Sequence, residues 1–136
     1  MVREIVKDVE FLSKPSSDCS FPSRELFEDL RDTLLSHKGT CLGLAASMIG
    51  VRKRALALFI EDSVKVIFNP VIVSSSDTYD TEEGCLSLEG ERKTKRFEFI
   101  QLLYFDWKGR EKFSTFSSLE AEVIQHEIDH MNGILI

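Results

Sequence analysis

The chain has 136 residues, of which 43% are hydrophobic and 29% are charged, and this composition is typical of one globular domain with one core. Its formal net charge is −6 at pH 7, which argues against nucleic acid or an anionic membrane as the main partner. The N-terminal segment carries several charged side chains and no long apolar run, so we expect neither a signal peptide nor a membrane anchor. We therefore expect a single cytoplasmic domain over residues 1–136.

The first predicted element is a helix that follows a loop rich in Ser and Pro over residues 13–22. Pro22 and Ser23 form a helix-start signal, and Gly39 is well placed to end the helix. Between these limits apolar residues recur at helical spacing, at Leu26, Phe27, Leu30 and Leu34. We therefore expect a helix there with one apolar face toward the core.

The period of the apolar residues then changes to that of β-strands. Four strands are predicted, over residues 54–60, 64–73, 97–105 and 110–116. Asn69-Pro70 interrupts the second of them, which indicates an edge or a bulge at that point. The basic run over residues 92–96 is expected to be a solvated loop or a strand edge.

The last predicted element is a helix that begins near Ser117 and stops at Asn132-Gly133. Ser117 and Glu120 have the spacing of a capping box. An apolar stripe follows at Leu119, Val123, Ile124, Ile128 and Met131. The order of helix, several antiparallel strands and helix predicts an α+β fold.

Two histidines on this last helix are the first sign of chemistry. His126 and His130 lie one helical turn apart, so their rings share a face about 6 Å apart along the axis and can bind one divalent metal ion. Glu127 lies beside the first of them, as in the H-E-x-x-H arrangement of metallohydrolases. The alternative is a polar face in water, but it would have to place two of the chain's three histidines here by chance. Asp129 is expected to face solvent or to hydrogen-bond a backbone group or a partner of the ligands.

Two histidines leave a tetrahedral site short of one protein ligand. His37 is a poor candidate, because it lies at the predicted end of the first helix, beside Lys38. Residues 82–87 form a polar segment that we expect between strands, and it contains Cys85. A thiolate there would complete a Cys-His-His set, but spacing alone explains Cys85 equally well as a buried apolar thiol.

Together these segments resemble the peptide deformylase family, which carries three motifs in this order. Residues 41–48, CLGLAASM, resemble the family's G-φ-G-φ-A-A-x-Q, in which φ is apolar. Residues 83–87, EGCLS, and residues 125–130, QHEIDH, match the second and third motifs, E-G-C-L-S and Q-H-E-x-x-H. The resemblance covers roughly residues 20–136, nearly the whole chain.

The resemblance implies antiparallel β-sheet packed around the C-terminal helix, and one divalent metal ion held by Cys85, His126 and His130. In the family this ion is usually Fe(II), and Zn, Ni or Co can replace it. The implied activity is that of a hydrolase that removes the N-formyl group from the N-terminal methionine of nascent peptides. In that reaction the metal acidifies a water molecule, Glu127 takes its proton, and the formyl carbon is attacked.

The resemblance also implies how a peptide is bound. The peptide would add as a strand to a sheet edge, with its methionine side chain in an apolar pocket. We expect Leu42, Gly43, Leu44 and Gly84 to bind it. The expected partners are formylated peptide N-termini, with ribosome-associated nascent chains as a further candidate.

The first motif departs from the family pattern at two positions, where Cys41 replaces the opening Gly and Met48 the closing Gln. In the family that Gln donates a hydrogen bond to the developing oxyanion, together with a backbone N–H that here belongs to Leu86. A thioether has no donor, and loss of one such donor costs about 10²–10³ in rate. We therefore expect reduced or altered activity; the alternative is a weak or inactive deformylase-like metal protein that binds N-terminal peptides.

Three widely spaced cysteines do not indicate a disulfide framework. Cys19 and Cys41 are expected to be buried thiols. The alternative at Cys41 is that the added Cβ reshapes or narrows the cleft, because a substrate backbone would pass close to it.

Overall fold

A five-stranded antiparallel sheet and three α-helices make up the computed structural model, which describes all residues from Met1 to Ile136. The elements are α1 (Val9–Leu12), α2 (Arg24–Ser36), β1 (Gly43–Ala45), the 3-10 helix η1 (Ala46–Ile49), β2 (Ala55–Ile60), β3 (Ser63–Cys85), β4 (Leu88–Phe105), β5 (Glu111–Ser117) and α3 (Ser118–Met131). The strands lie in the sheet in chain order, from β1 at one edge to β5 at the other. The predicted α+β fold, with antiparallel strands and a C-terminal helix, is confirmed.

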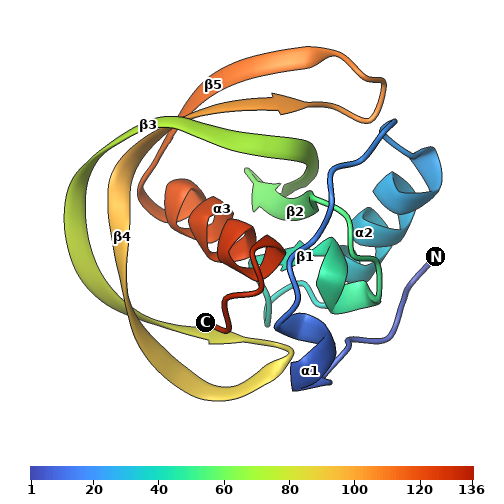
Figure 1. Cartoon of the computed structure of the whole chain (residues 1–136), viewed down its shortest axis with the longest axis horizontal. Coiled ribbons are helices and arrows are strands. Elements are labelled where there is room, and N and C mark those ends of the chain that lie inside the picture. Colours follow the sequence, from blue (N-terminus) through green and yellow to red (C-terminus); the bar gives the residue numbers. More distant parts are fainter.

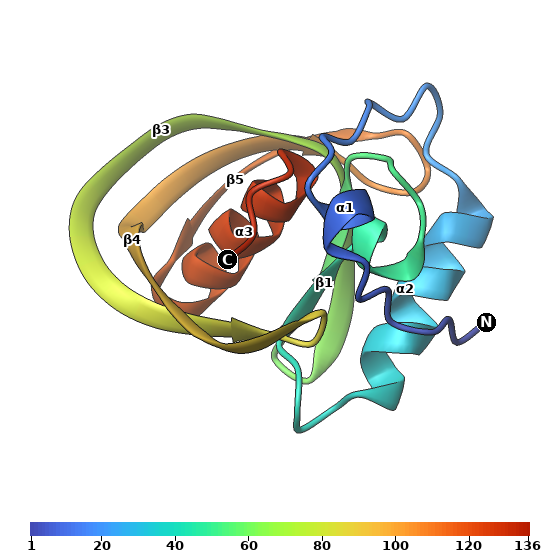
Figure 2. The ribbon, with the colours of Figure 1, turned by 60° about the horizontal axis from the view of Figure 1, so that its bottom comes forward.

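The long strands β3 and β4 curve around α3, which lies at the centre of the molecule (Figures 1 and 2). Their pairing shifts in register between Phe68 and Val71, between Ile72 and Ser74, and between Gly84 and Cys85. Extra residues of this kind bend a strand and increase its twist. The irregularity predicted at Asn69-Pro70 is therefore confirmed, and it helps β3 to turn around the helix.

Two apolar clusters pack on opposite faces of the sheet, and β2 contributes to both. Ala55 and Ala57 face the cluster that contains the buried leucines of α2, whereas Leu56 and Leu58 face the cluster that contains the apolar stripe of α3. Successive side chains of a strand point to opposite faces, so a strand between two helices is apolar at every position. This packing holds α3 firmly against the sheet.

Both predicted long helices are present. At the start of α2 the hydroxyl of Ser23 accepts the N–H of Leu26 at 3.2 Å, as the helix-start signal predicts. At the start of α3 the predicted capping box is wrong, because the side chain of Ser117 makes no cap hydrogen bond. The neighbouring Ser118 hydroxyl instead donates to Glu98 of β4 at 2.8 Å, which ties the start of α3 to the sheet.

The region over residues 74–96 differs from the prediction. We expected a strand that ends at residue 73 and a polar loop over residues 82–87, whereas β3 continues to Cys85 and β4 begins at Leu88. Opposite charges face one another across this ribbon, as in the pairs Asp80 with Lys95 and Glu82 with Lys93. Such cross-strand pairs stabilise the ribbon, although it buries little apolar surface. Because the ribbon has no buried apolar face, its sequence lacks the alternation of apolar and polar residues by which a strand is predicted.

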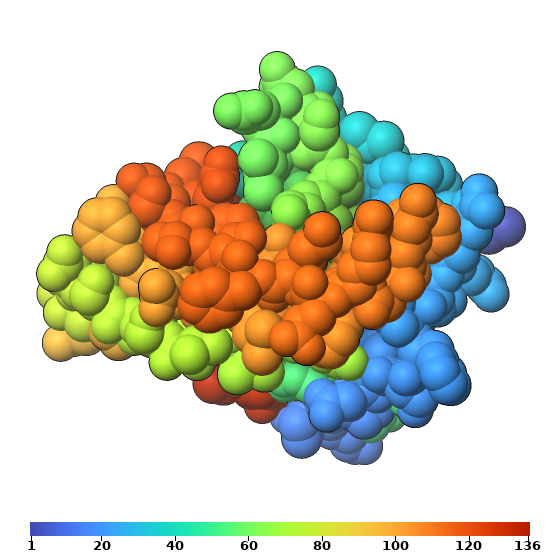
Figure 3. Space-filling view, turned by 90° about the horizontal axis from the view of Figure 1, so that it is seen from above, coloured from blue at the N-terminus to red at the C-terminus, as the bar shows by residue number.

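The edge of the sheet that β5 forms lies on the surface. Figure 3 shows the face on which the atoms of β5, in orange, run across the molecule. The longest helix, α3, has 14 residues, and no helix combines the length and the apolar character needed to cross a membrane.

Candidate metal centre

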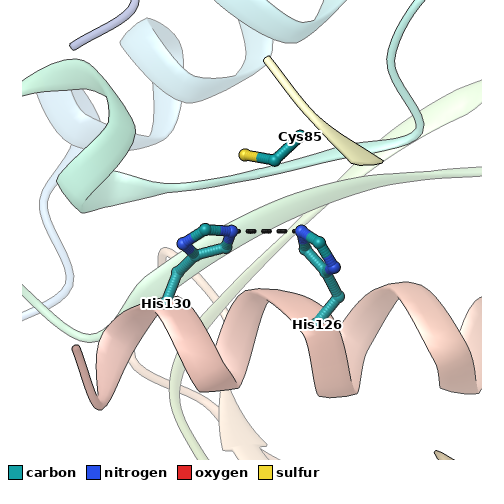
Figure 4. Close-up of side chains that lie close together, drawn as sticks. All are labelled: Cys85, His126 and His130. Carbon is teal, nitrogen blue, oxygen red and sulfur yellow. Dashed lines mark hydrogen bonds between the residues drawn. The ribbon is translucent and has the colours of Figure 1, made fainter. Parts of the chain in front are cut away.

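The three side chains singled out as metal ligands lie together. Cys85 ends β3, and His126 and His130 project from one face of α3 toward it (Figure 4). One ligand atom from each residue lies within 4.8 Å of the other two. The Nε2 atoms of the two rings face each other at 3.0 Å. The structure thus brings together two residues one helical turn apart and one that lies more than 40 positions earlier in the chain.

The chemistry of these donors fits a divalent transition-metal ion. His130 is fully buried and its Nδ1 has no partner, and burial together with the neighbouring His126 lowers the pKa of His130 to about 3. A neutral imidazole is the form that binds metal. The backbone N–H of Ser87 donates to Sγ of Cys85 at 3.4 Å. Sulfur and two ring nitrogens match the donor sets of zinc and related metals, whose bonds measure about 2.0–2.3 Å.

A buried ion-pair network orients His126. Its Nδ1 lies 2.8 Å from Oε1 of Glu83, and Arg96 donates to Glu83 through Nη2 at 2.7 Å and through Nε at 3.0 Å. Arg96 also donates to Asp129 at 2.6 Å. Burial disfavours the Glu83 carboxylate, but His126 and Arg96 outweigh it and lower the pKa of Glu83 to about 2. A second layer of this kind fixes the ring so that Nε2 faces the other ligands.

Only part of this network was predicted from the sequence. Asp129 hydrogen-bonds Arg96, which in turn holds Glu83. It therefore joins the network behind the ligands, one of the alternatives predicted for it. Arg96 was expected in a solvated loop or edge, and this is wrong, since it is 4% exposed. Its position in the basic run gave no sign of burial. In the register of β3 and β4, Arg92 lies directly opposite Glu83. Arg96 lies opposite Tyr79, so it reaches Glu83 along the same face of the ribbon.

The pKa values of His126 and Glu127 are both raised, but for different reasons. Burial alone lowers the pKa of His126, but Glu127, Cys85 and Glu83 raise it to about 10. Burial raises the pKa of Glu127 to about 7, and His126 and the N–H of Ala45 oppose the rise. Oε1 of Glu127 is buried without a hydrogen-bond partner, which is rare for a carboxylate oxygen. This atom is therefore free to accept a proton from a bound molecule.

A cleft of about 580 Å³ opens beside these residues. One wall comes from β1 and η1, the other from the turn between β3 and β4, and α3 forms the floor. Of the residues predicted to contact substrate or oxyanion, five line the cleft: Leu42, Gly43, Met48, Gly84 and Leu86. Leu44 does not line it, because its side chain points to the opposite side of β1 and is fully buried in the core.

Gly43 explains why the cleft wall can lie so close to α3. A Cβ atom at this position would be 2.6 Å from Cγ1 of Val123, 3.0 Å from the carbonyl oxygen of Ala57 and 3.2 Å from Oε2 of Glu127. Any side chain here would push β1 away from the helix. The glycine therefore serves close packing against α3 and also places the backbone of β1 next to Glu127.

The sulfur atoms of the first motif both contact backbone groups. Met48 is buried, and its Sδ accepts the N–H of Ala45 at 3.4 Å. Cys41 was expected to be a buried thiol, but it is only half-buried and lines the cleft, whereas Cys19 is buried as expected. All three cysteines are free thiols.

Comparison with known proteins agrees with these features. The family model for polypeptide deformylase matches residues 2–136. A peptide deformylase of Clostridium beijerinckii is 43% identical over 136 residues, which cover 100% of both chains. A peptide deformylase of Prochlorococcus marinus strain NATL2A is 44% identical over 118 residues, which cover 82% of this chain and 57% of that one.

Solved structures show the same likeness. A peptide deformylase of Legionella pneumophila superposes with a TM-score of 0.89 at 36% identity, covering 99% of this chain and 83% of that one. A class I type b peptide deformylase of Acinetobacter baumannii, bound to Met-Ala-Ser, gives a TM-score of 0.88 at 27% identity and covers 99% and 96%. With a family match over nearly every residue and a relative of equal length, the chain belongs to the peptide deformylase family and is a hydrolase of that type.

Proposed function

We propose that this protein removes the formyl group from the N-terminal methionine of nascent peptides, using a metal centre formed by Cys85, His126 and His130. The observation that carries the proposal is the convergence of these three side chains beside a buried, unpartnered oxygen of Glu127 on the floor of a cleft. Because its substrate is the nascent chain, we place the protein in the cytoplasm, near ribosome-associated chains.

The proposed ligand for the three side chains is one divalent ion, with Fe(II) as the native metal. When bound, such an ion polarises a carbonyl group and lowers the pKa of a water molecule. One sulfur and two ring nitrogens suit Fe, Zn, Ni and Co alike. Support for iron therefore comes from the family resemblance alone.

Glu127 is proposed as the group that moves the proton. Its Oε1 has no partner within the protein and its carboxylate faces the cleft, so it can accept a proton from water. The water oxygen bonds to the formyl carbon, and the proton passes through Glu127 to the amide nitrogen. The carbon–nitrogen bond then breaks to give formate and a free amino terminus.

The free edge of β1 is the proposed binding site for the peptide backbone. The carbonyl of Leu42 accepts the N–H of Phe59 at 3.3 Å, so alternate residues of β1 bond to β2. Gly43 and Ala45 therefore turn their backbone groups away from β2, where an added strand would meet them. For the methionine side chain the cleft offers apolar contacts from Leu86, Leu88, Leu119 and Val123.

Met48 is the reason why we expect a low rate of formyl-peptide hydrolysis. Its sulfur has no donor for a developing oxyanion, which leaves the backbone N–H of Leu86 as the remaining donor of the family pair. We therefore propose slow turnover. The second candidate function, capture of N-terminal peptides without hydrolysis, is favoured by this same residue.

The test is formate release from a formyl-Met peptide by protein purified without oxygen, with bound metal measured beside it. The proposal expects about one ion per chain and slow formate release. Glu127→Gln keeps the shape of the side chain and removes the proton acceptor, so it should retain metal and lose about 10²–10⁴ in rate. Metal-loaded protein that binds the peptide yet releases no formate would support the second function instead.

A further inference from the structure

Both residues that depart from the first motif place a sulfur atom on the free edge of β1. The thiol of Cys41 donates to the carbonyl oxygen of Gly43 at 2.9 Å. The sulfur of Met48 accepts the N–H of Ala45 at 3.4 Å. These carbonyl and N–H groups are the ones that point away from β2, because in an antiparallel pair the hydrogen bonds to β2 come from alternate residues, here Leu42 and Leu44.

The Gly43 carbonyl lies at the reacting end of the cleft. The Cβ position of Gly43 is only 3.2 Å from Oε2 of Glu127, so the backbone here stands beside the proposed proton acceptor. A peptide strand that brings its N–H groups to this edge would use the Gly43 carbonyl as its acceptor nearest the bond to be cut. In the peptide-free protein that acceptor already has a donor, the Cys41 thiol.

The Cys41 side chain packs against the edge of the core and makes no other hydrogen bond. It is half-buried, lines the cleft, and forms no disulfide. Burial raises the pKa of its thiol to about 12, with the charge of Glu127 adding to the rise, so the group keeps its proton and remains a donor. An incoming N–H, a stronger donor than S–H, can displace it without moving the backbone.

We propose that Cys41 determines how tightly this protein binds peptides, by competing with the peptide for the carbonyl of Gly43. The inference rests on the proposed function, because it assigns that carbonyl to the substrate. The thiol acts before the chemical step, so it raises the KM of the peptide and leaves kcat unchanged. The protein therefore favours peptides whose other contacts with the cleft stabilise the complex by more than the loss of the hydrogen bond between Cys41 and Gly43 costs.

The test compares Cys41→Ala, Cys41→Ser and the parent, all loaded with the same metal. KM and kcat are measured for formyl-Met-Ala-Ser, and the Kd of Met-Ala-Ser is measured by calorimetry. Alanine removes the donor, so KM and Kd should fall by about 2- to 10-fold, the size of one hydrogen bond, at constant kcat. Serine keeps a donor, so its KM and Kd should be no lower than those of the parent.

Cys19→Ala is the matched control, because the Cys19 thiol also contacts a backbone carbonyl, that of Arg54 at 3.8 Å, but lies outside the cleft. It should bind Met-Ala-Ser like the parent. Equal KM and Kd in Cys41→Ala and the parent would overturn the inference, as would an equal gain in Cys41→Ser. If the parent releases no formate, the proposed activity fails, while the calorimetric comparison of Met-Ala-Ser still decides the role of Cys41.

Discussion

The two sides of the cleft differ in the chemical groups that they offer. The side formed by the end of β3 and by α3 holds charged and metal-binding groups, and Arg96 locks them through bonds to Glu83 and Asp129. The side formed by β1 and η1 is apolar and offers only backbone groups, two of which are occupied by Cys41 and Met48. All departures from the family motifs lie on the second side. The proposed metal ligands and the proton acceptor thus lie on one side of the cleft, and both departures from the family motifs lie on the other.

The largest effect should follow from removing the sulfur ligand. Cys85→Ala leaves two ring nitrogens, and loss of a direct ligand should lower metal affinity by more than the factor of about 10–100 typical of an outer partner. Metal content after dialysis measures this, with Cys19→Ala as the control that should keep its metal. If Cys85→Ala held metal as tightly as the parent, Cys85 would not be a metal ligand, and the proposed centre at the end of β3 would be wrong.

The next largest effect should be a gain, on the other wall. Met48→Gln restores an amide donor at a buried position that lines the cleft, and we expect kcat to rise by about 10²–10³. Met48→Leu has similar volume and no donor, so its kcat should stay near that of the parent. No gain in a folded, metal-loaded Met48→Gln protein would show that the missing amide does not limit the rate.

Removal of the arginine behind the metal ligands should weaken both folding and metal binding. Arg96→Ala leaves the Glu83 carboxylate buried without its cation, which typically costs about 3–5 kcal/mol of stability. Loss of ring orientation at His126 should also reduce metal affinity by about 10–100-fold. Thermal unfolding and metal titration measure the two effects. Lys95→Ala, at an exposed neighbour on β4 that faces Asp80, should leave metal affinity unchanged and cost no more than about 1 kcal/mol of stability.

The smallest effect should come from crowding at β1. Gly43→Ala places a Cβ atom 2.6 Å from Val123, and overpacking of this kind costs about 1–3 kcal/mol. Adding Val123→Ala should recover only part of the loss, because the carbonyl of Ala57 at 3.0 Å is backbone and cannot yield as easily. Complete recovery of thermal stability in the double variant would mean that β1 can move away from α3.

The metal-binding side of the cleft was predicted from the sequence better than the side formed by β1 and η1. The closeness of His126 and His130 was predictable because helical spacing fixes their relative positions, and Cys85 was expected beside them through its motif. The role of the three as ligands stays a prediction. The motif does not say which way each side chain of β1 points, and alternation along the strand sends the side chain of Leu44 into the core, so its contact with a peptide stays a prediction. The contacts of Cys41 and Met48 with the backbone depend on the strand edge, which no local pattern encodes.

The long ribbon of β3 and β4 was missed for a related reason. Residues 74–82 are mostly exposed, so no apolar alternation marks them as strand. Cross-strand pairing of opposite charges stabilises them instead, and that requires knowledge of the register. The burial of Arg96 follows from the same register. The prediction that residues 1–136 form a single domain stays a prediction.

X-ray absorption spectroscopy of the metal-loaded protein tests the central claim most directly. The account predicts one sulfur at about 2.3 Å and two ring nitrogens at about 2.0–2.1 Å from the ion, with the sulfur signal absent in Cys85→Ala. A spectrum with oxygen neighbours only, or a sulfur signal that survives in Cys85→Ala, would contradict the metal centre.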